Sequence, residues 1–108
     1  MKAYSAPTGN SYDQIQELRE LFLGTMGKTF RVLFVSRGRN EVRDMRARLR
    51  RIDRTTVEED RRNHQFHVWD VVKRDWRIVP LERVAAFRCG SVEWYSSVSS
   101  MSAKGGAS

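Results

Sequence analysis

Five short segments rich in β-branched and aromatic residues constrain the fold of this chain most strongly. They are separated by charged or turn-forming residues and span residues 29–36, 41–50, 65–71, 75–79 and 85–89. Lengths of this order are typical of β-strands. In the second segment, apolar residues alternate with arginines in the order Met45, Arg46, Ala47, Arg48, Leu49 and Arg50. Because alternation puts the two kinds of side chain on opposite faces of a strand, the chain is predicted to be mainly β.

One helix is predicted ahead of the first strand. Ser11 and Gln14 have the spacing of a capping box, in which two side chains satisfy free amides at the start of a helix. Apolar residues then recur at steps of three and four up to Gly24 or Gly27, and they are Ile15, Leu18, Leu21, Phe22 and Met26. Such a stripe has to be buried, so we expect it to pack against the strands.

The second strand and the segment after it carry two further local signals. Val42 is out of step with Met45, which predicts a β-bulge near Arg43 or Asp44. Residues 51–64 are densely charged and lack strand periodicity. They predict a long, mobile loop before the third strand.

The two ends of the chain differ in composition from its middle. Residues 1–10 are small and polar and include proline and glycine, so they predict a flexible lead. The serine- and glycine-rich residues 96–108 predict a disordered tail. A chain of 108 residues has room for one domain, which is placed at residues 11–95.

Together these elements predict a small, mainly β domain, a five-stranded antiparallel SH3-like or Sm-like barrel with one N-terminal α-helix. Pro80 should end the fourth strand because it lacks an amide donor, and a short helical turn at 81–84 precedes the last strand. The residues expected in the apolar interior or under the helix are Phe30, Val32, Phe34, Met45, Leu49, Phe66, Val68, Ile78, Leu81, Val84 and Phe87.

Charge is the strongest signal of function. Twenty lysines and arginines against thirteen acidic residues give a net charge of +7. Nine arginines fall between residues 29 and 54, namely Arg31, Arg37, Arg39, Arg43, Arg46, Arg48, Arg50, Arg51 and Arg54. Arginine presents a planar fork of donors that suits phosphate and carboxylate groups, so this set predicts an anionic partner. Codon usage in a GC-rich genome is the alternative explanation of the arginine content.

Three of these arginines form the best candidate surface. Arg46, Arg48 and Arg50 share one strand face at a spacing of about 6 to 7 Å, which can follow a phosphate backbone. The acidic run at residues 58–60 would neutralise part of this face if the charged loop folded back onto it.

Other chemistry-bearing residues have weaker signals. Trp69 and Trp76 would either stack on bases or, as we favour here, close the core. His64, His67 and Cys89 are too few and too dispersed for a structural zinc site, so neither a metal nor any other cofactor is predicted. Because the sequence contains no catalytic constellation, the chain is not expected to be an enzyme.

Four stretches, in this order and spacing, carry a resemblance to a known family. They are TFRV at 29–32, VRDMRARL at 42–49, VWD at 68–70 and WRIVPLERV at 76–84. The chain resembles the short phage-encoded proteins with a WYL-like, Sm-like SH3 β-barrel, which implies this fold and a phage origin. It departs from their pattern at Arg48, where threonine is usual, and in its longer charged loop. The pair at 94–95, Trp-Tyr, is not followed by leucine and lies beyond the predicted barrel.

We therefore expect a non-enzymatic, phage-type module that engages nucleic acid, RNA or DNA, through the arginine-rich strand face. Two alternatives stay open: an effector that binds and modulates a host polymerase, nuclease or defence component, and an assembly protein whose copies associate edge to edge. The single cysteine favours a reducing cytoplasm, that of the infected bacterium if the chain is phage-encoded. No apolar run approaches the roughly 20 residues that span a bilayer, so no membrane attachment is expected.

Deleting residues 1–8 and 98–108 should leave the thermal unfolding midpoint nearly unchanged, because neither segment carries a periodic apolar pattern. Circular dichroism melts of the full and trimmed chains measure this. A large loss of stability on trimming would show that one of these segments docks on the domain, and would favour a protein partner.

Overall fold

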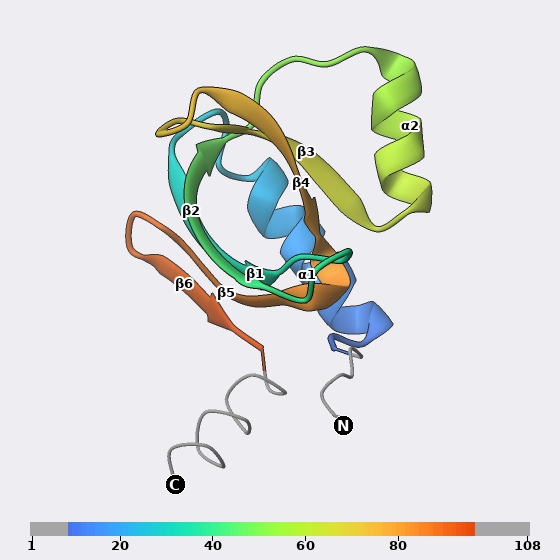
Figure 1. Ribbon diagram of the computed structural model, residues 1–108, viewed down its shortest axis with the longest axis vertical. Helices are drawn as coiled ribbons and strands as arrows, with labels where there is room; N and C mark the ends of the chain where they lie inside the picture. The colour runs from blue at the N-terminus through green and yellow to red at the C-terminus, as the bar shows by residue number, and fades with distance from the viewer. Residues whose placement is uncertain (1–8, 97–108) are drawn as a thin grey trace, which may run out of the picture.

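Six antiparallel strands form one strongly curled sheet in the order β4-β3-β2-β1-β5-β6 (Figure 1). The computed structural model describes residues 9–96, so most of the predicted lead and tail lies outside the described residues. The strands are β1 (Phe30–Val35), β2 (Val42–Arg48), β3 (Gln65–Asp70), β4 (Asp75–Pro80), β5 (Val84–Cys89) and β6 (Val92–Tyr95). The mainly β, antiparallel prediction is confirmed. The prediction of a closed five-stranded barrel is wrong, because the sheet has a sixth strand and its edges, β4 and β6, do not pair.

The sixth strand is the part of the sheet that the sequence analysis missed. It folds back on β5 through a turn at Gly90, whose φ of 62° suits glycine. Trp94 pairs with Phe87 and is only 8% exposed, and its indole Nε1 donates a hydrogen bond to Glu17 Oε1 at 2.9 Å. Placing this tryptophan beyond the barrel was therefore wrong. Four residues with one inward side chain give too little alternation to be recognised as a strand.

The N-terminal helix follows its prediction closely. Helix α1 (Tyr12–Leu23) starts with the reciprocal capping box between Ser11 and Gln14 and ends at Gly24. Its buried residues are Ile15, Leu18 and Phe22. Met26, which was placed on the same stripe, is 84% exposed because it follows the helix end in a turn with a φ of 53°.

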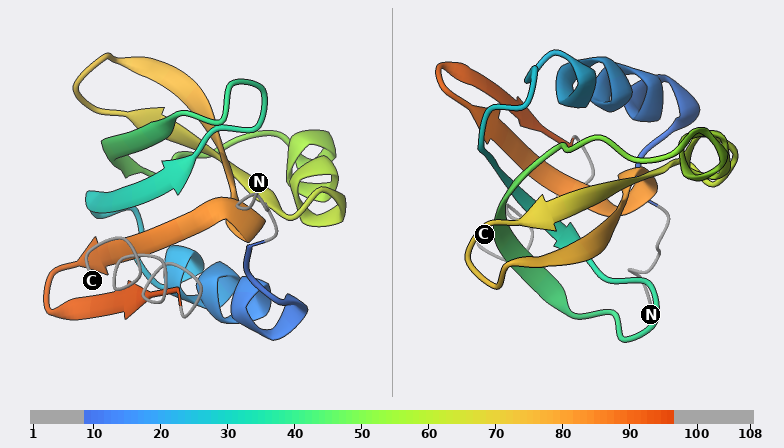
Figure 2. Two further views of the ribbon diagram at one scale, coloured as in Figure 1. Left: turned by 60° about the horizontal axis from the view of Figure 1, so that its bottom comes forward. Right: turned by 90° about the horizontal axis from the view of Figure 1, so that it is seen from above.

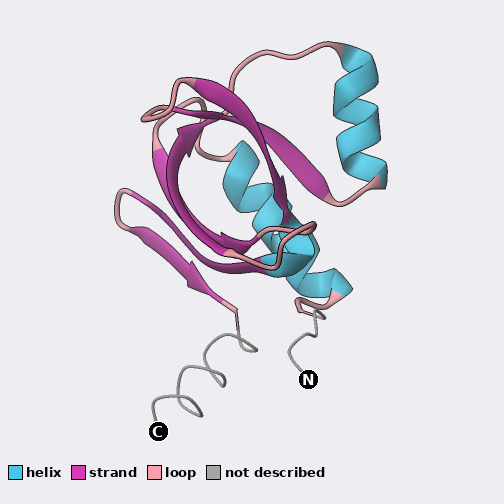
Figure 3. Cartoon of the chain, in the orientation of Figure 1, coloured by secondary structure: helices cyan, strands magenta, loops and turns pink. Residues whose placement is uncertain are grey.

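Phe22 of α1 lies at the centre of the core. Its ring centroid is 4.9 Å from that of Phe30, 4.9 Å from that of Phe66 and 5.0 Å from that of Phe87. These partners come from three different strands, so α1, which lies across one open end of the curled sheet, closes its interior with the Phe22 ring (Figures 2 and 3). Most of the predicted core is buried, with Leu49 and Phe66 partly so. Ile78 is the exception: it is 45% exposed, because the inward residue of β4 is its neighbour Val79.

The predicted bulge in β2 is also wrong. β1 and β2 pair without interruption from Phe30 opposite Ala47 to Val35 opposite Val42, so Val42 simply faces outward. The irregularity lies on the other side of β1, where the pairing with β5 shifts between Leu33 and Phe34. Such a shift adds twist and helps the sheet to curl.

Residues 51–64 are not a loop, because they contain helix α2 (Arg54–Arg62). Asp53 caps its start by accepting a hydrogen bond from the amide of Thr56 at 2.7 Å, which also lowers the pKa of Asp53. The one buried residue of α2 is Asp60. A helix anchored by a carboxylate instead of an apolar stripe has no hydrophobic periodicity, and for this reason the sequence pattern missed it.

The chain turns after Pro80 into the short 3-10 helix η2 (Leu81–Arg83), at the place of the predicted helical turn. Among residues 9–96, neither α-helix combines the length and the apolar character needed to span a bilayer.

Asn10 and Ser96, which the sequence assigned to lead and tail, are both buried at η2. The Asn10 amide donates to the carbonyls of Leu81 at 2.8 Å and Val84 at 2.9 Å and accepts from the Ser96 hydroxyl.

Replacing Asn10 with alanine should lower the free energy of unfolding by about 1–3 kcal/mol, because two buried carbonyls lose their donor. Urea denaturation followed by tryptophan fluorescence measures the change. The matched control is Asn63→Ala at the exposed C-cap of α2, which should shift stability by less than about 0.5 kcal/mol. Equal effects of the two substitutions would contradict this role of Asn10.

Candidate nucleic-acid interface

Two of the predicted arginines stand on the outer face of β2. Arg46 and Arg48 are exposed, while Met45 and Ala47, which alternate with them, are buried, as the sequence pattern predicts. Neither arginine makes an ion pair with any residue of the described segment 9–96. Their charge is therefore available to a ligand.

Two tryptophans continue this surface across the sheet. Trp69 of β3 pairs with Arg48, and Trp76 of β4 pairs with Trp69, so the three form one row across β2, β3 and β4. The indole rings meet edge to face, with centroids 5.5 Å apart. Trp76 is 37% exposed, and its prediction as a core residue is wrong. The inward positions of β3 belong to Phe66 and Val68, and strand geometry sends Trp69 the other way.

Arg50 completes the surface from just beyond the end of β2. Its guanidinium carbon lies 4.4 Å from the ring centroid of Trp69 and 5.9 Å from that of Trp76, a cation–π arrangement. We call this set the basic–aromatic face, and its members are Arg46, Arg48, Arg50, Trp69 and Trp76.

A second row of arginines adjoins this face. Arg31 of β1 pairs with Arg46, and Arg88 of β5 pairs with Arg31. Arg31 makes two hydrogen bonds to Asp44, at 2.8 and 2.7 Å, which lower the pKa of the Asp44 carboxyl and raise that of the arginine. Arg88 lies 3.4 Å from Glu93. This row is therefore partly neutralised, unlike Arg46 and Arg48.

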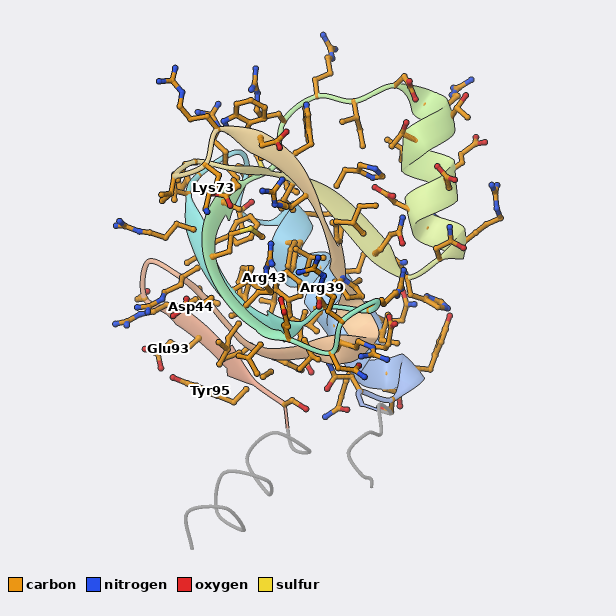
Figure 4. The ribbon with its side chains drawn as sticks, viewed as in Figure 1. Arg39, Arg43, Asp44, Lys73, Glu93 and Tyr95 are labelled. Atoms are coloured by element: carbon orange, nitrogen blue, oxygen red, sulfur yellow. The ribbon has the colours of Figure 1, made fainter. Side chains whose placement is uncertain are left out.

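A hollow of about 670 Å³ opens beside these rows, between the β3–β4 and β5–β6 turns. Lys73 adds a cation to its wall, together with Arg31, Arg46 and Arg88 (Figure 4 labels Lys73 and Asp44). One of its two carboxylates, that of Asp70, already accepts hydrogen bonds from the amides of Val72 and Lys73 at 2.9 Å each. The hollow is thus predominantly cationic.

The other predicted arginines do not join the basic–aromatic face. Arg37 is a structural clamp, because its guanidinium donates to Glu82, to the Gln65 side chain and to the carbonyl of Asn63. Arg39 and Arg43 each lie 3.8 Å from Glu41 (Figure 4 labels both). The remaining two lie in the linker after β2 and at the first position of α2, and they are Arg51 and Arg54.

The acidic run does not cover the basic–aromatic face. Asp60 points into the fold, where it accepts hydrogen bonds from the Gln65 side chain at 3.0 Å and from the His67 amide at 2.9 Å, with His67 Nδ1 at 2.8 Å. Glu58 and Glu59 are exposed on α2 and make no ion pair with any residue that the structure describes.

Contacts within the fold engage His67 and Cys89, whereas the buried Nδ1 of His64 has no hydrogen-bond partner among the described residues. His67 lies on a strand face, and its Nδ1 is hydrogen-bonded to the Asp60 carboxylate. Cys89 lies on β5 with its thiol 3.7 Å from the carbonyl of Thr29. Within residues 9–96, no three His, Cys, Asp or Glu side chains are grouped so that they can hold a metal ion.

Comparison with models of known protein families, with curated proteins and with solved structures finds no match to this chain. The resemblance to phage-encoded WYL-like barrels stays a prediction. Only the geometry of the site therefore bears on the function of this chain.

The Arg31→Ser substitution should raise the pKa of Asp44 towards its ordinary value, because the hydrogen bonds that stabilise its ionised form are lost. Carboxyl ¹³C NMR titration measures both this pKa and that of Asp75, which is lowered by Arg77 and serves as the internal control. A pKa of Asp44 that does not move, or an equal shift at Asp75, would contradict the pairing.

Proposed function

We propose that this chain is a non-enzymatic module that binds single-stranded nucleic acid on the basic–aromatic face. The observation that supports this most is the placement of two unpaired arginines beside two partly exposed tryptophans on adjacent strands. Phosphates need cations and unstacked bases need aromatic surfaces, and this face offers both within one row of the sheet.

Each member of the face has a role in this proposal. Arg46 and Arg48 bind successive phosphates, because residues two apart on a strand are separated by about 6 to 7 Å. Trp76 offers a partly exposed ring on which a base can stack. In the free protein the Arg50 guanidinium lies over the Trp69 ring. A base that stacks on Trp69 displaces this guanidinium, which can then bind a phosphate.

The aromatic pair favours a single strand over a duplex. In a duplex the faces of the bases are already stacked on one another and cannot reach a tryptophan, whereas in a single strand they are free. The cationic hollow beside the face continues the path for the phosphate backbone towards Lys73.

The phage origin and the cytoplasmic location belong to the same proposal. They are supported by the ordered motifs of the sequence resemblance. A protein that binds single strands in an infected cell would need no cofactor, and its affinity would depend on salt.

The triple substitution of Arg46, Arg48 and Arg50 by serine should weaken binding and flatten the salt dependence. With about 0.7 released counterions per phosphate contact on a single strand, the slope of log K against log salt should fall by about two. Fluorescence anisotropy with a labelled oligo(dT) and oligo(U) measures both quantities. The Trp76→Ser change should instead weaken binding about 5- to 150-fold with little change in slope, since stacking is worth about 1–3 kcal/mol per base.

The control is a triple serine variant with the same loss of charge elsewhere, at Arg39, Arg54 and Arg62, which should retain most of the affinity. A further variant, Asp44→Asn, should bind more tightly than wild type because it releases Arg31. The proposal fails if wild type does not bind at low salt, or if the two triple variants behave alike. Tighter binding to duplex than to single strand would reject the stacking role.

A further inference from the structure

A second surface, remote from the hollow at Lys73, combines exposed apolar residues with free arginines. It is a groove of about 300 Å³ bounded by α1, the linker between β2 and α2, α2 itself and the start of β3 (Figure 2 shows these elements together). Its apolar walls come from all four elements and are formed by Leu23, Leu49, Ile52, Val57 and Phe66.

The groove leaves apolar surface in water. Leu23 is 56% exposed and Val57 is 43% exposed, although both line a concave site. Helix α2 is held to β3 by the buried carboxylate of Asp60, so its one aliphatic side chain, Val57, is not needed to dock the helix. An apolar side chain from another molecule that entered the groove would bury the exposed surface of Leu23 and Val57, which the fold itself leaves in water.

The rim of the groove is positively charged. Four arginines line it, and they are Arg19, Arg50, Arg51 and Arg61. Arg51 and Arg61 make no ion pair with any residue described by the structure. The only acidic residue in the lining, Asp60, is already occupied by Gln65 and His67. An apolar floor beside two arginines without ion pairs is complementary to an apolar side chain flanked by carboxylates.

We infer that this groove binds an acidic, amphipathic segment of a partner protein. One or two aliphatic side chains of the segment enter between Leu23 and Val57, and its Asp or Glu residues pair with Arg51 and Arg61. The volume is at the lower end of the range of about 300 to 1,000 Å³ for ligand sites, which suits anchoring side chains better than a whole cofactor.

Two other possible occupants, the ends of this chain and a nucleic acid, fit the groove less well than an acidic segment. The ends of the chain outside the described residues, 1–8 and 97–108, contain lysine but no Asp or Glu, so they do not complement an arginine rim. A nucleic acid would meet the arginines, but the two exposed apolar side chains of the groove, Leu23 and Val57, are aliphatic and offer no stacking surface. The inference is independent of the proposed function, apart from Arg50, which borders both sites.

The test uses the full chain and a labelled synthetic peptide with leucines at helical spacing and glutamates elsewhere, followed by fluorescence anisotropy. The Val57→Glu variant should weaken peptide binding at least about tenfold, because it puts a like charge where an aliphatic anchor lies. The double variant Arg51→Ser, Arg61→Ser should weaken binding and reduce its dependence on salt. A peptide with lysine in place of every glutamate should not bind.

Matched controls keep the composition and change the position. Met26→Glu adds the same charge at an 84% exposed site outside the groove lining, and Arg39→Ser, Arg62→Ser removes the same charge elsewhere. Both should bind the acidic peptide like wild type. Circular dichroism melts of each variant separate lost binding from lost folding.

Four outcomes would overturn the inference. They are no binding of the acidic peptide at low salt, equal effects of groove and control variants, a concentration-dependent dimer that Val57→Glu abolishes, and tighter peptide binding once residues 97–108 are removed. The last two would assign the groove to a second copy or to the chain's own end. If Val57→Glu lowered the affinity for oligo(dT), the groove would belong to the nucleic-acid site and the inference would fail as well. The effect of substituting only Arg46 and Arg48 on oligo(dT) binding tests the proposed function and leaves this inference untouched.

Discussion

The packing of Phe22 against three strands is the interaction on which the rest of this structure depends. The sheet curls but does not close, so hydrogen bonds between its edges do not hold its interior shut. The phenylalanines of β1, β3 and β5 meet the ring of Phe22 instead, at about 5 Å each. Burial of these rings stabilises both the helix and the sheet, because each supplies apolar surface that the other covers. Once the concave side is filled in this way, the convex side is free for polar and aromatic residues.

The composition of the convex side follows from strand geometry and register. Inward residues of β2 and β3 alternate with outward ones, and the pairing of β2, β3 and β4 aligns Arg48, Trp69 and Trp76. Two tryptophans in partial contact with water leave apolar ring surface unburied, which costs free energy. Their contact with Arg50 reduces that cost, because a cation over an indole face gains electrostatic energy while its charged edge stays in water.

The parts of the fold that were predictable from the sequence are those in which apolar periodicity determines the element. The capping box and apolar stripe located α1, and alternation placed Arg46 and Arg48 outward. Helix α2 and strand β6 were missed because polar contacts hold them, and such contacts leave no apolar periodicity in the sequence. Asp60 of α2 bonds to Gln65 and His67, and Trp94 of β6 bonds to Glu17, which is distant in the sequence. The orientation of Trp69 was also misjudged, because a large apolar residue in a strand was assumed to be buried, whereas its position parity places it outside.

Arg50 connects the two proposed binding surfaces, so the two ligands compete for one side chain. In the free protein its guanidinium lies over Trp69, and its side chain also borders the groove beneath α2. One guanidinium cannot pair with a phosphate on the convex face and with a carboxylate at the groove at the same time. If binding of an acidic segment draws Arg50 away from the tryptophans, it removes one cation from the nucleic-acid path while uncovering an indole ring. Linkage makes the competition for Arg50 reciprocal, so each ligand weakens the binding of the other by the same factor.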